Sequence, residues 1–346
     1  MWNCLLHRFF LQLLALAFIL SQRRPNRLLD SITGAYASAA SLGRDRSGEQ
    51  GWVGLMTVAR VAVGTGSTEE QGAGGGAAAP VANAACGRNP SGSAVALGVS
   101  PDPIFHVFLL FGQSNMGGVP DPEAEDLVEQ ERVQVLAYDN CSTLGRSYNE
   151  WHTASPPLHS CRAGVGPGDH FAKRMIEACP NSRVGLVPCG VHGADIDFFR
   201  KDVVSSRRSE FSIPPDNHWT GAYEWMVERA RLAQRSGVIR GILFHQGESD
   251  NTDPAWPGKV AGIVSDLRQD LGLVDSTPFV AGELLHSGCC AAHNARVAEL
   301  LGLIPTSAVV SAKGLNGMDP YHFDLAGQRE LGSRYATAML SLLARL

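Results

Sequence analysis

The sequence lacks several features that would assign a function directly. It contains no C-x-x-C and no H-E-x-x-H, so we expect neither a zinc ribbon, nor a thioredoxin-type site, nor a metalloprotease helix. Its formal net charge is −5 and its basic residues form no block, so nothing points to a nucleic-acid partner. With 346 residues, of which 44% are hydrophobic, the chain can form one large α/β domain with a full core.

The N-terminal apolar stretch is too short to cross a bilayer. It runs from Phe9 to Leu20 after a weakly basic start at Arg8, whereas a membrane-spanning helix needs ~20 apolar residues. Such a stretch suits a secretory signal, so we predict that residues 1–21 are a signal peptide or signal anchor. The protein is then expected to be secreted or endomembrane, with membrane contact only through an uncleaved anchor. Because no A-x-A cleavage site follows, organelle targeting is the alternative.

Residues 22–100 differ in composition from the rest of the chain. They are rich in Gly, Ala and Ser, as in "GTGSTEEQGAGGGAAAP", and they have few large apolar residues. Such a segment cannot bury enough surface to offset the entropy cost of ordering it. We therefore predict a disordered linker over residues 22–100 and a folded domain over residues 101–346.

Strand-like and helix-like segments alternate from Pro101 onward. Six apolar runs are typical of buried strands, namely "HVFLLFG", "VQVLAYD", "RVGLVPCG", "GILFHQG", "TPFVAGELL" and "SAVVSAKGL". Helix-like segments separate or follow them at Gly168–Ala178, Gly221–Ser236, Ala255–Leu271, Ala291–Leu301 and Asp324–Arg345. This alternation predicts a mainly parallel sheet with helices on both faces, in which ligands bind beyond the carboxyl ends of the strands.

Polar residues capable of chemistry follow these runs. Ser114 comes directly after the first run, in "GQSN", and is a candidate nucleophile, although a serine at this position alone is more often an ordinary turn residue. Asp319 and His322 come three residues apart after the last run, so a carboxylate can orient an imidazole within one turn. Together the three residue types suit acyl transfer. The Gly-x-Ser-x-x-Gly spacing differs from the Gly-x-Ser-x-Gly elbow of α/β-hydrolases.

The stretch "FHQGESD" is a further dense group of polar residues. The Gln246 amide can donate to an oxyanion, and Glu248 can hold the loop by hydrogen bonds to its backbone. A metal site is the alternative for this stretch, built on His245, Glu248 and Asp250 with His286 and His293 in reserve. No known metal-ligand spacing supports that alternative.

Four blocks in order resemble a known family. "LLFGQSNMGG", "VGLVPCGVHGADI", "GILFHQGESD" and "MDPYHFDLAGQRELGSRYA" are similar to the SGNH-type esterases of the sialate O-acetylesterase domain group, and more specifically to carbohydrate esterase family 6, the acetyl xylan esterases and their plant relatives. The resemblance covers roughly residues 105–346. It implies a flavodoxin-like three-layer α/β/α fold and deacetylation of a sugar ester through an acyl-enzyme, with no metal or cofactor.

The resemblance also implies a role for individual residues. Ser114 is expected as nucleophile, His322 as general base and Asp319 as its orienter. The oxyanion donors are expected to be the Ser114 backbone N–H, Gly193 and the Gln246 side chain, and Gln113 is expected to brace the nucleophile loop. The chain departs from the family pattern at His192-Gly193-Ala194, where Gly-Gly-Ser or Gly-Gly-Thr is usual, and at Phe199, near a usual Trp. Because His192 adds bulk next to an expected oxyanion donor, we expect it to alter the shape of the acyl pocket.

Two other functions are compatible with the same residues. A non-catalytic glycan-binding relative would keep the fold without ester turnover, and a metal-dependent hydrolase would use His245 and Glu248. Cysteine usage adds a structural expectation, because Cys141 and Cys161 bracket a loop and can pair in an oxidising compartment. A bridge between the neighbours Cys289 and Cys290 is uncommon and is not expected.

Overall fold

The computed structural model describes residue 86 and residues 100–215 and 218–346, all of them within the unit Gly72–Leu346. The predicted leader, residues 1–21, lies outside the described residues. So does the predicted linker apart from Cys86 and Ser100. Among the helices of the described ranges, none is both long enough and apolar enough to span a membrane.

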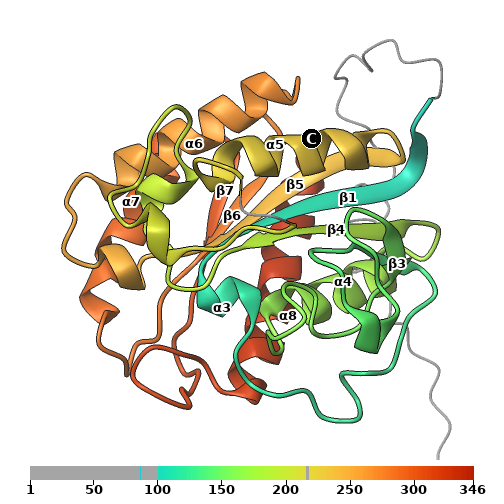
Figure 1. Ribbon diagram of the computed structural model, residues 1–346, viewed down its shortest axis with the longest axis horizontal. Helices are drawn as coiled ribbons and strands as arrows, with labels where there is room; N and C mark the ends of the chain where they lie inside the picture. The colour runs from blue at the N-terminus through green and yellow to red at the C-terminus, as the bar shows by residue number, and fades with distance from the viewer. Residues whose placement is uncertain (1–85, 87–99, 216–217) are drawn as a thin grey trace, which may run out of the picture. The chain divides into compact units, whose positions relative to one another are not determined.

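The described chain forms a seven-stranded sheet (Figure 1). Its spatial order is β3-β2-β4-β1-β5-β6-β7, and every neighbouring pair is parallel except β2 and β3. The strands are β1 (Asp102–Gly112), β2 (Val133–Leu136), β3 (Trp151–Thr153), β4 (Arg183–Gly190), β5 (Gly237–His245), β6 (Phe279–Gly282) and β7 (Ser307–Val310). All six predicted strands are present. The edge strand β3 was not predicted, because three partly exposed residues give no readable apolar pattern.

Helices cover both faces of the sheet, so the predicted three-layer arrangement is confirmed (Figure 1). One face carries α5 (Ala222–Gln234), α6 (Trp256–Asp270) and α7 (Asn294–Leu303). The other carries α3 (Ser114–Gly117), α4 (Pro167–Ala178) and α8 (Leu325–Leu343). Short 3-10 turns complete the fold, namely η1 (Ser142–Leu144), η2 (Ile196–Phe199), η3 (Arg208–Glu210), η4 (Glu248–Asp250) and η5 (Ala291–His293).

The central strand β1 is buried on both sides. Val107, Leu109 and Phe111 contribute to the core under α5, α6 and α7. Phe108 and Leu110 contribute to the core under α4 and α8. Side chains of a strand alternate between its two faces, so a run that is apolar at every position fits only a strand covered on both faces.

The carboxyl ends of three strands meet at one level. In the sheet register, Gly112 at the end of β1 lies opposite Gly190 of β4 and opposite His245 of β5. The loops after these strands therefore begin side by side, at the centre of the sheet where the strand order reverses. Such a point is the usual ligand crevice of an open α/β sheet.

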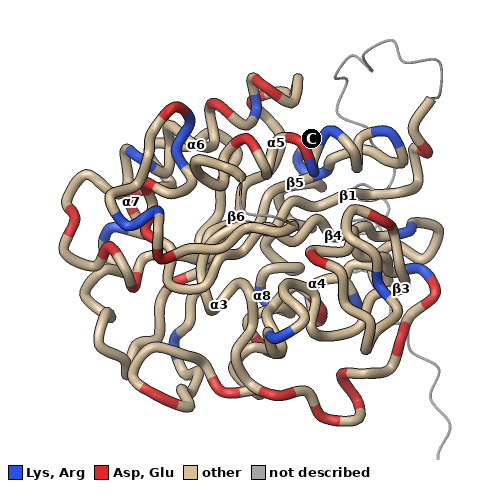
Figure 2. The backbone as a smooth tube through the Cα atoms, in the orientation of Figure 1, with Lys and Arg blue, Asp and Glu red and all other residues tan. Residues whose placement is uncertain are grey.

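Charged residues are interspersed over the described chain (Figure 2). Acidic residues recur along the loop from α3 to β2, and Arg329 of α8 pairs there with Glu123, Glu125 and Asp126. Lys173 of α4 pairs with Asp169 beside them. Arg329 thus neutralises part of the acidic loop, which agrees with the mixed charge pattern of the sequence.

Three disulfide bonds lie among the described residues. The predicted pair Cys141–Cys161 is bonded, and Cys86 is bonded to Cys179 at the end of α4, which sequence reasoning did not predict. Cys289 and Cys290 are also bonded to each other. A bridge between neighbours is uncommon, and here it forms within the turn after β6. Cys189 is a buried free thiol in β4.

Candidate active site

The turn after the central strand β1 places Ser114 at the carboxyl-terminal edge of the sheet. Gly112 has a positive φ of 139°, and a Cβ atom there would lie 2.0 Å from the backbone oxygen of His245, so only glycine fits. The Gln113 N–H donates to that same His245 oxygen at 2.9 Å. β1 and β5 are thus joined where they end, and Ser114 begins the four-residue helix α3 immediately beyond this joint.

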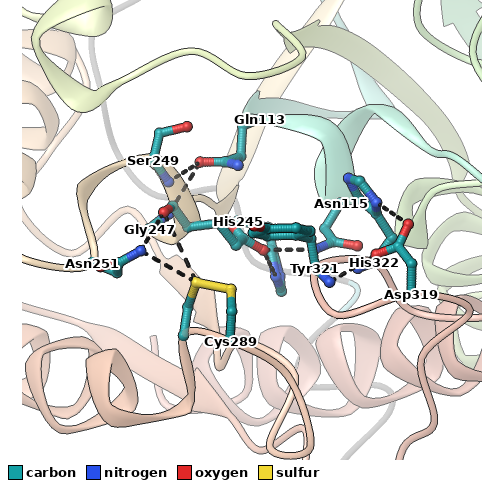
Figure 3. The surroundings of a disulfide bond; sticks show 12 residues. Gln113, Asn115, His245, Gly247, Ser249, Asn251, Cys289, Asp319, Tyr321 and His322 are labelled. Carbon is teal, nitrogen blue, oxygen red and sulfur yellow. Dashed lines mark hydrogen bonds and ion pairs between the residues drawn. A yellow bond between two sulfur atoms is a disulfide. The ribbon is translucent and has the colours of Figure 1, made fainter.

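Ser114, His322 and Asp319 form one hydrogen-bonded chain. Ser114 Oγ lies 2.9 Å from His322 Nε2. His322 Nδ1 in turn lies 2.7 Å from Asp319 Oδ2 (Figure 3). In this arrangement, Nδ1 carries the proton that Asp319 accepts, which leaves Nε2 free to accept the Ser114 proton. Three residues predicted as a set from distant parts of the sequence therefore lie in the geometry that acyl transfer needs.

Asp319 is held as a carboxylate. Burial opposes its ionisation, but hydrogen bonds from the His322 ring and from the backbone N–H groups of Tyr321 and His322 outweigh that effect, and its pKa is lowered. Both backbone donors bond Asp319 Oδ1, at 2.7 and 2.8 Å, so that Oδ2 is left to the imidazole. The D-x-x-H spacing thus forms a single tight turn around one carboxylate.

Asn115, which sequence reasoning did not single out, fixes the His322 loop against the nucleophile. Its side chain donates to the Tyr321 carbonyl at 2.9 Å (Figure 3). It also accepts from the Phe323 N–H at 3.2 Å. The residues on either side of His322 are therefore bonded to the residue next to Ser114. This role depends on contacts between residues 206 and 208 positions apart, which no local pattern reveals.

Glu248 supports the triad indirectly, by binding the Asn115 side chain. It is buried, and its Oε1 accepts a 2.6 Å hydrogen bond from Asn115 Nδ2. Burial raises the pKa of Glu248 to about 7, although the hydrogen bond from Asn115 and the nearby His322 act in the opposite direction. Asp319 is therefore the carboxylate that contacts the His322 ring, whereas Glu248 anchors Asn115.

The loop after β4 brings Gly193 to the site. Gly193 has a positive φ of 72°, and its carbonyl accepts from Ser249 Oγ at 2.9 Å, which fixes the loop beside η4. Among the described residues, neither the Ser114 N–H nor the Gly193 N–H donates a hydrogen bond to a protein acceptor. An oxyanion hole requires donors that are not already used, so both N–H groups are available for the predicted role.

Gln246 and Gln113 hold these loops together. The Gln246 amide donates to the Ala194 carbonyl at 3.2 Å and to Asp250, and its oxygen accepts from Trp256 Nε1 at 2.5 Å. Both amide hydrogens are therefore engaged here, so donation to an oxyanion needs one bond to be exchanged and stays a prediction. Gln113 Oε1 lies 3.4 Å from the N–H groups of Gly247 and Ser249, which links the nucleophile turn to the β5 loop (Figure 3).

His192 packs over the nucleophile helix. A Cβ atom on Gly117, in the helix that begins at Ser114, would lie 2.5 Å from His192 Nε2, so the ring occupies the space that a side chain would need. Desolvation by its neighbours and the nearby His322 lower the pKa of His192. Phe199 is fully buried and its ring lies 5.7 Å from that of Phe111, so it belongs to the core under β1.

The residues of the metal alternative do not come together as a cluster. His245 Nε2 lies 4.0 Å from Glu248 Oε1, whereas exposed His286 pairs with Glu283 at 2.7 Å and His293 packs edge-on against Trp256. Within the described part of the chain, the one group spaced to hold a metal ion is Asp126, Asp169 and His170, none of them among the predicted ligands. Arg329 and Lys173 already pair with that group.

A vicinal disulfide borders the site (Figure 3). The Cys289 N–H donates to the Pro320 carbonyl in the Asp319–His322 turn at 2.9 Å. On the other side, the Asn251 amide lies 3.3 Å from Cys290 Sγ, just after η4. The bridged pair therefore connects the loop that carries Glu248 to the loop that carries His322.

Comparison with known proteins places this chain in a family. The sequence model of the family described as "Carbohydrate esterase, sialic acid-specific acetylesterase" matches residues 104–341. The chain belongs to this family. It is therefore a carboxylic ester hydrolase of the carbohydrate O-acetylesterase type, which confirms the resemblance read from the four sequence blocks.

Individual relatives agree with that assignment. A probable carbohydrate esterase of Arabidopsis thaliana is 31% identical over 261 residues, which cover 70% of this chain and 93% of the relative. A solved Arabidopsis thaliana structure is 26% identical with a TM-score of 0.56, covering 69% of this chain and 99% of the other. The crystal structure of NanS shares the fold, with 20% identity, a TM-score of 0.53, and coverage of 69% and 98%.

Proposed function

We propose that this protein removes O-acetyl groups from an acetylated glycan, such as acetyl xylan or another acetylated polysaccharide, by a serine mechanism. The observation that carries the proposal is the hydrogen-bonded chain from Ser114 through His322 to Asp319, with distances of 2.9 and 2.7 Å. That chain lies at the carboxyl edge of the sheet, where ligands of this fold class bind, and among the described residues the adjoining Ser114 N–H donates to no protein acceptor.

The first half of the reaction forms an acyl-enzyme. Ser114 Oγ attacks the acetyl carbonyl carbon while His322 Nε2 takes the hydroxyl proton, and Asp319 stabilises the imidazolium that results. The Ser114 and Gly193 N–H groups stabilise the negative charge that develops on the carbonyl oxygen. The bond to the sugar oxygen then breaks, and His322 returns the proton to that oxygen, so the sugar leaves as an alcohol.

The second half releases acetate. Water loses a proton to His322 Nε2 and attacks the acetyl-Ser114 carbonyl, and collapse of the intermediate returns the proton to Ser114 Oγ. Acetate release from a panel of acetylated glycans tests the proposal, with wild type beside Ser114→Ala. We expect release from at least one glycan by the wild type alone. Glycan binding without acetate release by the wild type would instead indicate a non-catalytic relative.

The proposed location is the secretory pathway or the cell exterior. Three disulfide bonds among the described residues support an oxidising compartment. Fusion of residues 1–21 to a reporter protein tests this, because a functional signal directs the reporter to the secretory pathway and a mitochondrial or plastid location would contradict it.

A further inference from the structure

An exposed aromatic side chain lies next to the catalytic histidine. Tyr321 is 51% exposed, which makes it the most exposed Phe, Trp or Tyr residue in the part of the chain that the structure describes. Its ring centre lies 6.2 Å from that of His322. An exposed ring beside this histidine contributes little to the core and is accessible to a ligand that enters the site.

The backbone that carries this ring is fixed on both sides. The Tyr321 N–H donates to Asp319 Oδ1 at 2.7 Å, and its carbonyl accepts from Asn115 Nδ2 at 2.9 Å. Met318, which is 54% exposed, lies on the same turn and donates its N–H to the His322 carbonyl at 2.9 Å. The turn therefore presents two apolar side chains to solvent from a rigid backbone, at little entropic cost on binding.

The reaction decides which half of the ester meets Tyr321. The carbonyl oxygen must face the Ser114 and Gly193 N–H groups, whereas the leaving oxygen must lie within reach of His322 Nε2 to receive its proton. The acetyl group is thus directed toward the Gly193 loop and the alcohol half toward the turn that carries His322. Tyr321 lies on that same turn, with its ring centre 6.2 Å from that of His322.

We propose that Tyr321 is a specificity-determining residue whose ring forms a platform for the pyranose ring that carries the acetyl group. This inference rests on the proposed function. The C–H bonds of a sugar next to its oxygen atoms carry partial positive charge, and the face of an aromatic ring is negative, so the two attract while apolar surface is buried. An acyclic alcohol half has no such flat face, so the platform favours cyclic sugar esters.

Selectivity between two esters tests the platform. A monoacetylated methyl xylopyranoside offers a sugar ring and ethyl acetate does not, so we compare the ratio of their kcat/KM values. In Tyr321→Ala this ratio should fall about tenfold, mainly through a higher KM for the sugar ester. Tyr321→Phe should keep the ratio within about twofold, because the ring and not the hydroxyl makes the contact. Leu301→Ala, at a residue of α7 that is 54% exposed, is the matched control.

A binding experiment tests this inference separately from the proposed function. Calorimetric titration of Ser114→Ala with acetylated xylo-oligosaccharide measures affinity without turnover, and adding Tyr321→Ala should raise Kd about tenfold. An unchanged Kd, or equal losses on both esters in Tyr321→Ala, would overturn the platform role while leaving the esterase proposal intact. Weakened binding together with a wild type that releases no acetate would support the platform and contradict the esterase proposal.

Discussion

The free energy of unfolding of Glu248→Gln should increase relative to that of wild type as the pH rises. Burial raises the pKa of Glu248 from 4.5 to about 7. In the unfolded chain this carboxyl loses its proton at lower pH, so between the two values the folded state binds more protons and its stability falls as pH rises. At ~1.4 kcal/mol per pKa unit, wild type loses about 3 kcal/mol over this window, fully by about pH 8. The glutamine side chain of the variant does not titrate, and its amide oxygen can still accept from Asn115.

Urea unfolding followed by tryptophan fluorescence measures this difference. The free energy of unfolding of Glu248→Gln minus that of wild type should rise by about 3 kcal/mol between about pH 4.5 and pH 8. Glu299→Gln, on the exposed face of α7, controls for loss of a surface charge and should show no comparable rise. If the free energy of unfolding of Glu248→Gln differs from that of wild type by the same amount at both pH values, the reasoning is refuted. Such a result would mean that burial does not raise the pKa of this carboxyl.

Three further changes probe the rest of the site and the fold. Asp319→Asn removes the acceptor that fixes the His322 tautomer, so kcat should fall by about 10³–10⁴-fold in steady-state kinetics, with far-UV circular dichroism unchanged. Asn115→Ala leaves buried Glu248 and the backbone on both sides of His322 without partners, and should cost about 2 kcal/mol or more in urea unfolding together with a drop in kcat. Cys86→Ser opens a bridge that spans 93 residues and should lower stability by about 2–5 kcal/mol in the same titration.

The architecture could be predicted because its signals are local. A strand buried on both faces is apolar at every position, as in Val107–Phe111, and a helix on a sheet shows apolar residues at helical spacing. Both patterns are readable within one segment. β3 escaped prediction because its three residues lie at the sheet edge and their burial depends on the partner strand.

The triad could be predicted because its residue types are chemically distinctive and follow strands. The contacts that hold it could not, since they join residues far apart in sequence. Asn115 looked like part of a turn until the fold placed it between Tyr321 and Phe323. The Gln246 side chain looked available for an oxyanion until the fold placed Ala194 and Asp250 within reach of its amide.

The disulfide bonds show the same difference between local pairs, which the sequence can predict, and pairs that depend on the fold. Cys141 and Cys161 flank one loop, so their pairing could be anticipated from the sequence. The sequence around Cys86 shows no strand or helix periodicity, and its partner Cys179 follows the end of α4. The bond between Cys289 and Cys290 depends on a turn after β6 that the sequence does not specify.

Direct detection of the acyl-enzyme tests the central claim, that Ser114 is the nucleophile of an O-acetylesterase. The protein is mixed with an acetylated xylo-oligosaccharide, quenched in acid, digested and analysed by mass spectrometry. The account predicts a mass increase of one acetyl group on the peptide that contains Ser114 in wild type, no such increase in Ser114→Ala, and a loss of acetate release of about 10⁴-fold or more in that variant. Acetate release by Ser114→Ala at the wild-type rate would contradict it.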